Sequence, residues 1–467
     1  MCYQPRKARH PRVLLQVGGM TETTAPETQH FTKAVAQLGE SRPVVASRAI
    51  FNAQGVKIVE KGVAINLGLY DRLMQHQLSA PMEDAVAATS TVTGKSLREI
   101  AEETMRDVPF FARMAPDAKT RGVLLDAIEK LPLPDAMAFQ LTLAYEVRPE
   151  IYLHSVRSAL TCAWLALVPM GSRFDVGMAA AAGLLHDVGM LHVDPLLLQP
   201  EHDLSEEQRR QLYSHPILAT TLIERHHVYP KEVVRAVAEH HENLDGSGYP
   251  RSLTEGSISD LGSALSLAEV VTAMFTPGRQ APELRLSVIL RMNQKRYAPG
   301  LVKRVLELVQ PLQDASGAVM SLLSDPVGRL REIDRVIGEW PAEALAGQTQ
   351  TRQRQDALTS LTAQAAQLHR NLASVGAAPG QLDQLGTEAL DDLLQQELSL
   401  LAVEATWQLR ALERQCRRLW RLAADEAFPT PLQLWLDQVG AQVTQSDPVQ
   451  DTPVEGVLTP AMASTAE

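Results

Sequence analysis

Histidines and carboxylates gather in the middle of this chain of 467 residues. Nine of the 13 histidines lie between His154 and His241, a concentration well above even spacing. Imidazole combined with carboxylate suits divalent iron or manganese, and the three scattered cysteines give no pattern for a structural zinc site. Such ligand sets are typical of metal-assisted hydrolysis. The candidate ligands are Glu150, His154, His186, Asp187, His215, His240, His241 and Glu269.

The spacing of these residues predicts that several helices supply them. Glu150 and His154 are four residues apart, so on a helix they share one face within about 6 Å. His186 and Asp187 are adjacent, which on a helix separates their directions by roughly 100°. His215 precedes a proline, a favoured first helical residue, and therefore lies at a predicted helix entrance. We expect the ligands to meet across a groove between helices.

A glycine-containing loop follows His240 and His241. Its sequence, Asp245-Gly246-Ser247-Gly248-Tyr249-Pro250, predicts a tight turn. The two glycines permit backbone conformations closed to other residues, so successive N–H groups can turn toward a phosphate. The other histidines of the region, at positions 192, 202, 226 and 227, match no ligand position and are expected on the surface or in loops.

The elements that must position these residues are mainly α-helical. Apolar residues recur every three or four positions from about Leu67 onward, and Ser205 with Gln208 forms a predicted capping box. Before them, 44–51 and 56–59 read as two short strands around a turn that contains Gly55. The expected organisation is a flexible arm (1–33), a hairpin-plus-helices unit (34–144), a central ligand-bearing domain (145–342), a C-terminal helical hairpin (343–445) and a disordered tail (446–467).

Two apolar stripes predict the C-terminal hairpin. The first contains Leu358, Leu361, Ala365, Leu368 and Leu372, and the second contains Leu394, Leu398, Leu401, Ala405, Leu409, Leu412, Cys416 and Leu419. A Pro-Gly pair at 379–380 separates them, so an antiparallel arrangement is expected. Packing within the chain is favoured over the alternative, a surface for a protein partner or for self-association.

Composition narrows the class of protein. A hydrophobic fraction of 45% and a charged fraction of 21% are ordinary for a folded globular chain of two to four units. The net charge of −11 argues against binding a nucleic acid polymer. The odd number of scattered cysteines fits a reducing compartment, and no window of about eighteen uncharged apolar residues predicts a membrane span. The expected location is the cytoplasm.

The motifs together resemble the HD-GYP subfamily of HD-superfamily phosphohydrolases. The resemblance covers about residues 145–308 and rests on 182–189 (Ala-Gly-Leu-Leu-His-Asp-Val-Gly), on His215-Pro216, and on His240-His241-Glu242 with the loop at 245–250. It implies an HD-type helical bundle that holds two or three divalent ions, iron or manganese. It also implies hydrolysis of the bacterial messenger cyclic di-GMP to pGpG and GMP.

The resemblance also assigns roles. The eight candidate residues become metal ligands, with Asp187 bridging and catalytic, Glu150 as the extra carboxylate of members with a third metal, and Glu269 where the family usually has aspartate. The residues expected to contact the substrate are Asp245, Gly246, Gly248, Tyr249, Pro250 and Arg279.

Two departures from the family pattern keep other functions open. Met190 stands where the family usually has a lysine near the scissile phosphate, and the segment from Glu269 to Arg279 retains only fragments of the usual motif. One alternative is therefore a catalytically weak or inactive module that binds a nucleotide or a protein. The other is a phosphohydrolase that acts on a different nucleotide.

Overall fold

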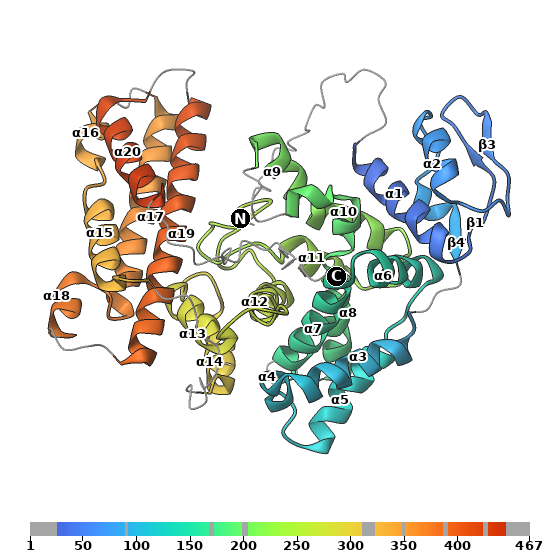
Figure 1. Cartoon of the computed structure of the whole chain (residues 1–467), viewed down its shortest axis with the longest axis horizontal. Helices are drawn as coiled ribbons and strands as arrows, with labels where there is room; N and C mark the ends of the chain where they lie inside the picture. Colours follow the sequence, from blue (N-terminus) through green and yellow to red (C-terminus); the bar gives the residue numbers. More distant parts are fainter. Residues whose placement is uncertain are drawn as a thin grey trace, which may run out of the picture. The chain divides into compact units, whose positions relative to one another are not determined.

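The computed structural model describes residues 26–88, 92–167, 172–198, 204–310, 323–347, 351–385, 391–423 and 428–444. The chain divides into two compact units, residues 1–89 and 90–467. Helices dominate both described parts, which confirms the predicted mainly α fold (Figure 1). None of the described helices is both long and apolar enough to cross a membrane.

The first unit combines two helices with two small antiparallel sheets. Its elements are α1 (Pro26–Ser41), β1 (Val44–Ala46), β2 (Ile50–Phe51), β3 (Lys57–Val59), α2 (Leu67–Met74), η1 (Met82–Asp84) and β4 (Val86–Ala88). The expected hairpin exists only as β2 with β3, because β1 pairs with the distant β4 instead. Helix α1 begins inside the expected flexible arm, since burial of Phe31, Val35 and Leu38 holds it in place. Residues 1–25 of that arm lie outside the described part.

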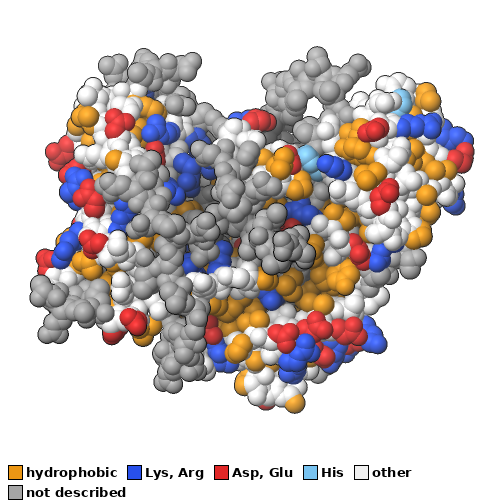
Figure 2. Space-filling view, in the orientation of Figure 1, with side chains coloured by type: hydrophobic (Ala, Val, Ile, Leu, Met, Phe, Trp, Pro, Cys, Tyr) orange, Lys and Arg blue, Asp and Glu red, His pale blue; other side chains and the backbone are white. Residues whose placement is uncertain are grey.

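The boundary expected at residue 144 differs from the observed one. Helices α3 (Gly94–Asp107), α4 (Pro109–Arg113), α5 (Ala118–Glu129) and α6 (Asp135–Val147) belong to the second unit. The apolar faces of α3, α5 and α6 pack on α7 (Pro149–Ala166), and α5 also packs on α8 (Arg173–Leu185). Their outer surface carries acidic and basic side chains side by side (Figure 2), among them Arg98 paired with Glu102, Asp126 and Glu129.

The centre of the second unit is built around α7, α8 and α12 (Asp260–Met274). Small residues let α7 and α8 approach closely, since a Cβ on Gly183 would lie 2.5 Å from the Ser158 carbonyl oxygen. Helix α12 packs on α7, and α11 (Lys231–Glu239) packs on α8 and α12 (Figure 1). The remaining elements are η2 (Val188–His192), η3 (Pro195–Leu198), α9 (Glu206–Leu212), α10 (His215–Glu224), α13 (Pro282–Met292) and α14 (Pro299–Leu308). Helix α9 begins with the predicted Ser205–Gln208 capping box.

The C-terminal helices form a larger bundle than the expected hairpin. They are α15 (Pro326–Gly338), α16 (Ala342–Ala346), α17 (Arg352–Ser374), α18 (Pro379–Leu382), η4 (Asp383–Leu385), α19 (Asp392–Ala423) and α20 (Thr430–Thr444). Helices α17 and α19 are antiparallel, because Arg354 contacts Trp420 while Asn371 meets Gln408. Helices α13, α15 and α20 also pack on α19, so the two predicted stripes lie in the chain's own core. The predicted disordered tail, 446–467, lies outside the described residues.

Candidate metal centre

Asp187 lies at the junction of two clusters of metal-ligating side chains. Within each cluster the ligand atoms lie within 4.8 Å of one another, and every member is buried. The first cluster contains His154, His186, Asp187 and Glu269. The second cluster contains Asp187, His215, His240 and His241. Seven of the eight predicted ligands therefore converge, and only Asp187 belongs to both clusters.

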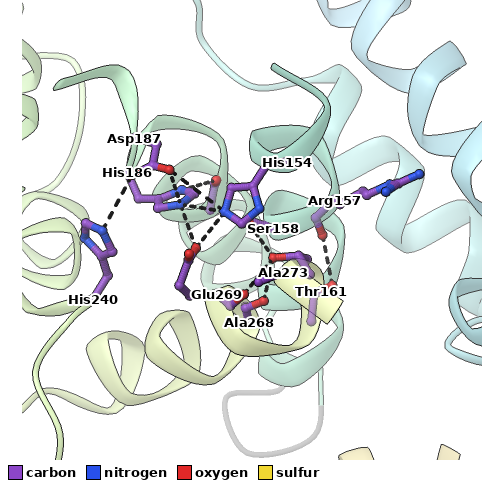
Figure 3. A network of polar contacts seen from close by, with 12 residues as sticks. His154, Arg157, Ser158, Thr161, His186, Asp187, His240, Ala268, Glu269 and Ala273 are labelled. Atoms are coloured by element: carbon purple, nitrogen blue, oxygen red, sulfur yellow. Dashed lines mark hydrogen bonds and ion pairs between the residues drawn. The ribbon is translucent and has the colours of Figure 1, made fainter. Parts of the chain in front are cut away.

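The first cluster is assembled from α7, from the end of α8 and from α12. His154 and His186 both point toward Glu269 (Figure 3), whose Oε2 lies 2.6 Å from Nε2 of His154 and 3.0 Å from Nε2 of His186. The two imidazole Nε2 atoms are 3.2 Å apart. Asp187 approaches this cluster with Oδ2, 3.4 Å from Nε2 of His186.

The second cluster faces the other carboxylate oxygen of Asp187. Oδ1 lies 3.4 Å from Nε2 of His215 and 3.7 Å from Nε2 of His240. The Nε2 atom of His215 is 3.2 Å from that of His240 and 3.0 Å from that of His241. The buried Oδ1 has no hydrogen-bond partner within the described residues. A buried carboxylate oxygen without a hydrogen-bond partner is suited to coordinate a cation.

Backbone carbonyls fix the orientation of three of the imidazoles. In each case Nδ1 donates to the carbonyl three residues earlier: His186 to Gly183 at 2.8 Å, His215 to Leu212 at 2.8 Å and His240 to Val237 at 2.6 Å. A ring that donates from Nδ1 and is neutral carries a lone pair on Nε2. Neutral His215 and His240 therefore direct their Nε2 lone pairs at each other, an arrangement that a bound divalent ion stabilises.

Electrostatics distinguishes the two clusters. Burial opposes charge on both acids, yet the histidines outweigh it: His186 and His215 hold the pKa of Asp187 below its ordinary value, and His154 and His186 hold that of Glu269 well below. Burial likewise opposes charge on His186, but Asp187 and Glu269 raise its pKa well above the usual value. Without a metal, the first cluster therefore retains a proton on His186.

The second cluster consists of neutral imidazoles. Burial lowers the pKa of His215, His240 and His241, and neighbouring histidines add to the effect, bringing the pKa of His240 to about 3. A neutral imidazole is the protonation state that coordinates a metal. The fold thus prepares these ligands without a proton to displace.

The loop at 245–250 supports the second cluster. The ring of Tyr249 stacks on His241, with centroids 4.6 Å apart, and on Tyr213, with centroids 4.0 Å apart, so both of its faces are covered. The Tyr249 N–H also donates to the carbonyl of His241. Asp245 accepts hydrogen bonds from the N–H and hydroxyl of Ser247. Gly246 has φ +79°, and the Tyr249–Pro250 peptide bond is cis. Contact between this loop and a substrate stays a prediction.

Gly248 allows the loop to lie against the chain that carries His241. A Cβ at this position would lie 2.4 Å from both the His241 carbonyl oxygen and the Asn243 nitrogen, so the backbone would have to move. We expect Gly248→Ala to destabilise the fold by about 1–3 kcal/mol and to weaken metal binding at the second cluster. Thermal unfolding and Mn²⁺ titration measure both effects. Gly300→Ala is the control, since open space surrounds that position; equal effects from both variants would contradict this prediction.

Glu150 is the predicted ligand that does not join either cluster. It shares α7 with His154, but its carboxylate pairs with Nε of Arg148 at 2.7 Å. Arg279, predicted to contact substrate, lies partly exposed in the turn after α12 and belongs to neither cluster. His192, expected on the surface, is buried in η2, while His202 lies outside the described residues.

Met190 is part of the apolar core. It is fully buried in η2 and packs in a cluster with Ile151, Val193, Leu197, Leu198 and Leu212. The side chain that stands at the lysine position thus serves packing, since five apolar neighbours surround it.

Two buried glutamates, Glu239 and Glu242, have a role that the sequence analysis did not predict. Glu239 accepts from the N–H and hydroxyl of Ser259, and Glu242 accepts from the N–H groups of Arg251 and Leu253. These bonds anchor the segment that follows the loop to the end of α11, where His240 and His241 lie. The signal was present in the sequence, because a glutamate flanks the histidine pair on each side.

Comparison with known proteins shows what part of this chain is similar to. Residues 157–300 match the HD domain. "3'3'-cGAMP-specific phosphodiesterase 3" of Vibrio cholerae is 26% identical over 48% of this chain and 52% of its own length. "Cyclic di-GMP phosphodiesterase PA4108" of Pseudomonas aeruginosa is 32% identical over 41% of this chain and 55% of its own length. The chain thus spans about half the length of these relatives.

One solved structure also aligns. It is described as Bd1817, a HDG"Y"P protein from Bdellovibrio bacteriovorus, and the alignment covers 60% of this chain and 98% of that one. The identity is 14% and the TM-score 0.33.

Proposed function

We propose that this chain is a metal-dependent phosphodiesterase acting on a cyclic dinucleotide, cyclic di-GMP in the first place. Its residues 157–300 match the HD domain, and the relatives above are named phosphodiesterases of cyclic dinucleotides. The observation that carries the proposal is Asp187, whose two carboxylate oxygens face two separate clusters of imidazoles and carboxylate. A shared carboxylate between two ligand sets suits a dinuclear centre for phosphodiester hydrolysis.

The residues fit divalent ions. Converging imidazole lone pairs, a buried Asp187 oxygen with no hydrogen-bond partner among the described residues, and the absence of thiolate from both clusters together suit iron or manganese. His154, His186 and Glu269 would hold one ion, and His215, His240 and His241 the other, with Asp187 between them. The pairing of Glu150 with Arg148 favours two ions over three.

In the mechanism, the chain's own residues would hold the metal ions and orient the ligand atoms. Bound divalent ions would lower the pKa of a water molecule and neutralise charge on the phosphate. Asp187 would bridge the two ligand sets, and its low pKa keeps it ionised for that role. The Nδ1 donations of His186, His215 and His240 keep their Nε2 atoms aimed at the centre. Burial excludes bulk water from the ligands and so strengthens each electrostatic contact.

We expect Mn²⁺ binding to release protons and to tighten as pH rises. The pKa of His186 is raised, so below that pKa a proton competes with the metal, and above it the competition is gone. Calorimetric titration of Mn²⁺ in buffers of different ionisation enthalpy measures the released protons at each pH. His369→Gln is the matched control, because His369 pairs with Asp334 outside both clusters. Binding that is independent of both pH and buffer would contradict this expectation.

Turnover with a panel of substrates tests the proposed function. The full chain, loaded anaerobically with iron or manganese, is incubated with cyclic di-GMP, 3'3'-cGAMP, linear pGpG and nucleoside phosphates, and the products are separated by chromatography. The proposal expects linear dinucleotide from a cyclic dinucleotide and no reaction after chelation. Cyclic dinucleotides that remain intact over hours would refute it, and turnover confined to another nucleotide would favour the alternative phosphohydrolase.

Met190 favours one second candidate, a module that binds a nucleotide without hydrolysing it. Its side chain is apolar and buried where the resembling family has a lysine, so this position offers no cation to a phosphate. Tight binding of cyclic di-GMP by the metal-loaded chain, with no product, would support this candidate over the phosphodiesterase.

A further inference from the structure

The turn between α13 and α14 touches two parts of the second unit that are far apart in sequence. Its residues Asn293 and Arg296 contact helix α19 of the C-terminal bundle. Arg296 also contacts the chain that follows His241. The turn therefore lies between the C-terminal bundle and the loop that supports the second cluster of the candidate metal centre.

Helix α19 anchors the turn through a buried polar group. Asn293 donates from Nδ2 to Oε1 of Glu404 at 2.9 Å, and Gln408 donates from Nε2 to Oδ1 of Asn293 at 3.1 Å and to Oε1 of Glu404 at 2.8 Å. All three side chains are buried. Because buried polar groups are costly to leave unpaired, these bonds fix the turn relative to α19. Arg296 adds a stacking contact, with its guanidinium carbon 5.7 Å from the ring centroid of Trp407.

Arg296 in turn holds the start of the loop. Its carbonyl accepts from the N–H of Leu244 at 3.0 Å, and its Nε lies 3.8 Å from Oδ2 of Asp245. The other carboxylate oxygen of Asp245 accepts from the N–H and the hydroxyl of Ser247. Arg296 thus contacts the loop with both its backbone and its side chain, while Trp407 covers the guanidinium.

The loop also contacts a candidate ligand, His241, through Tyr249. Tyr249 lies four residues after Asp245, stacks on the ring of His241 and donates its N–H to the carbonyl of that residue. Gly248 packs directly against the backbone of residues 241–243, since a Cβ at this position would not fit. A displacement of Asp245 therefore transmits to the ring that supports His241.

We propose that Arg296, held by Trp407 of α19, is a positioning residue for His241, so that the C-terminal bundle helps to set metal affinity at the second cluster. The inference rests on the proposed dinuclear centre and concerns only Asp187, His215, His240 and His241. Within the described residues, the contacts of Arg296 with Leu244, Asp245 and Trp407 involve no member of the first cluster, so the affinity of that cluster should not change in variants of Arg296.

Arg296→Ala is the test variant, and Arg291→Ala is its matched control. Arg291 also joins α13 to α19, through an ion pair with Glu397. Its side-chain bonds within the described residues go to Glu397 and to the carbonyl of Ser287, not to the loop. Mn²⁺ binding to the full chain is followed by equilibrium dialysis and by electron paramagnetic resonance, which detects coupling between neighbouring ions. Trp407→Leu is the second variant, because it removes only the contribution of α19 to the guanidinium.

Arg296→Ala should weaken the second Mn²⁺ site about 10-fold, the lower end of the effect of removing an outer support of a metal ligand. The first site should keep its affinity, and the spin-coupled signal should fall at limiting Mn²⁺. Trp407→Leu should act in the same direction, and Arg291→Ala should match the wild type. Unchanged affinity in Arg296→Ala, or an equal loss in Arg291→Ala, overturns the inference. Wild-type protein that binds no Mn²⁺ would instead refute the proposed centre itself.

Discussion

Replacing Asp187 with asparagine should remove both proposed metal ions and lower kcat/KM for the proposed substrate, cyclic di-GMP, on the order of 10³-fold or more. Asp187 is the only residue shared by the two clusters, and its two oxygens face different sets of imidazoles. Asparagine keeps the shape but loses the charge and one acceptor oxygen. Elemental analysis of the purified variant, together with product chromatography, measures both losses.

The matched control for this variant is Asp175→Asn. Asp175 lies in the first turn of α8, at the opposite end of the helix from His186 and Asp187. Its backbone N–H donates to the hydroxyl of Ser172, the N-cap of that helix. Asp175→Asn should retain both ions and full turnover. Metal content near the wild-type value in Asp187→Asn would show that the two clusters do not depend on a common carboxylate.

Introducing at position 190 the lysine of the family that the motifs resemble should destabilise this protein rather than activate it. Met190 is fully buried among apolar side chains, so Met190→Lys places an ammonium group, or a neutral amine without a partner, in that cluster. The expected loss of stability is about 2–4 kcal/mol, with no gain in kcat/KM. Thermal unfolding and steady-state kinetics give the two readouts.

Met190→Leu separates the effect of charge from that of shape. Leucine keeps nearly the same apolar volume and should cost less than about 1.5 kcal/mol. A large rise in turnover for Met190→Lys, with stability intact, would mean that the lysine reaches the phosphate and that the present site is held back by its absence. The packing of η2 would then adapt in a way that the structure does not indicate.

Much of the site could be predicted from the sequence because helix geometry determines where its candidate ligands lie. The proline after His215 fixes the start of α10, and His154 lies on the inward face of α7, as the helical period requires. The spacing of residues could not predict whether the side chain of Met190 is buried or exposed. A 3-10 helix as short as η2 has too few turns to show a periodic pattern of apolar residues. The spacing also could not predict that Glu150 turns to Arg148, a contact set by the entry of the chain into α7.

Long-range pairing explains most of the remaining differences in the fold. Strand β1 pairs with β4, forty residues away along the chain, and no local turn signal encodes that partner. Most of the α3 to α6 segment is predicted to belong to the N-terminal unit 34–144, because its periodicity is ordinary, yet α3, α5 and α6 pack on α7. The Nδ1 donations of His186, His215 and His240 are likewise visible only in three dimensions, although each acceptor lies three residues earlier.

Anomalous diffraction from crystals of the manganese-loaded chain tests the central claim most directly. The account predicts two manganese peaks about 3.5–4 Å apart, one beside His154, His186 and Glu269 and the other beside His215, His240 and His241, with Asp187 between them. A single peak, peaks elsewhere in the chain, or two peaks that share no contact with Asp187 would contradict it.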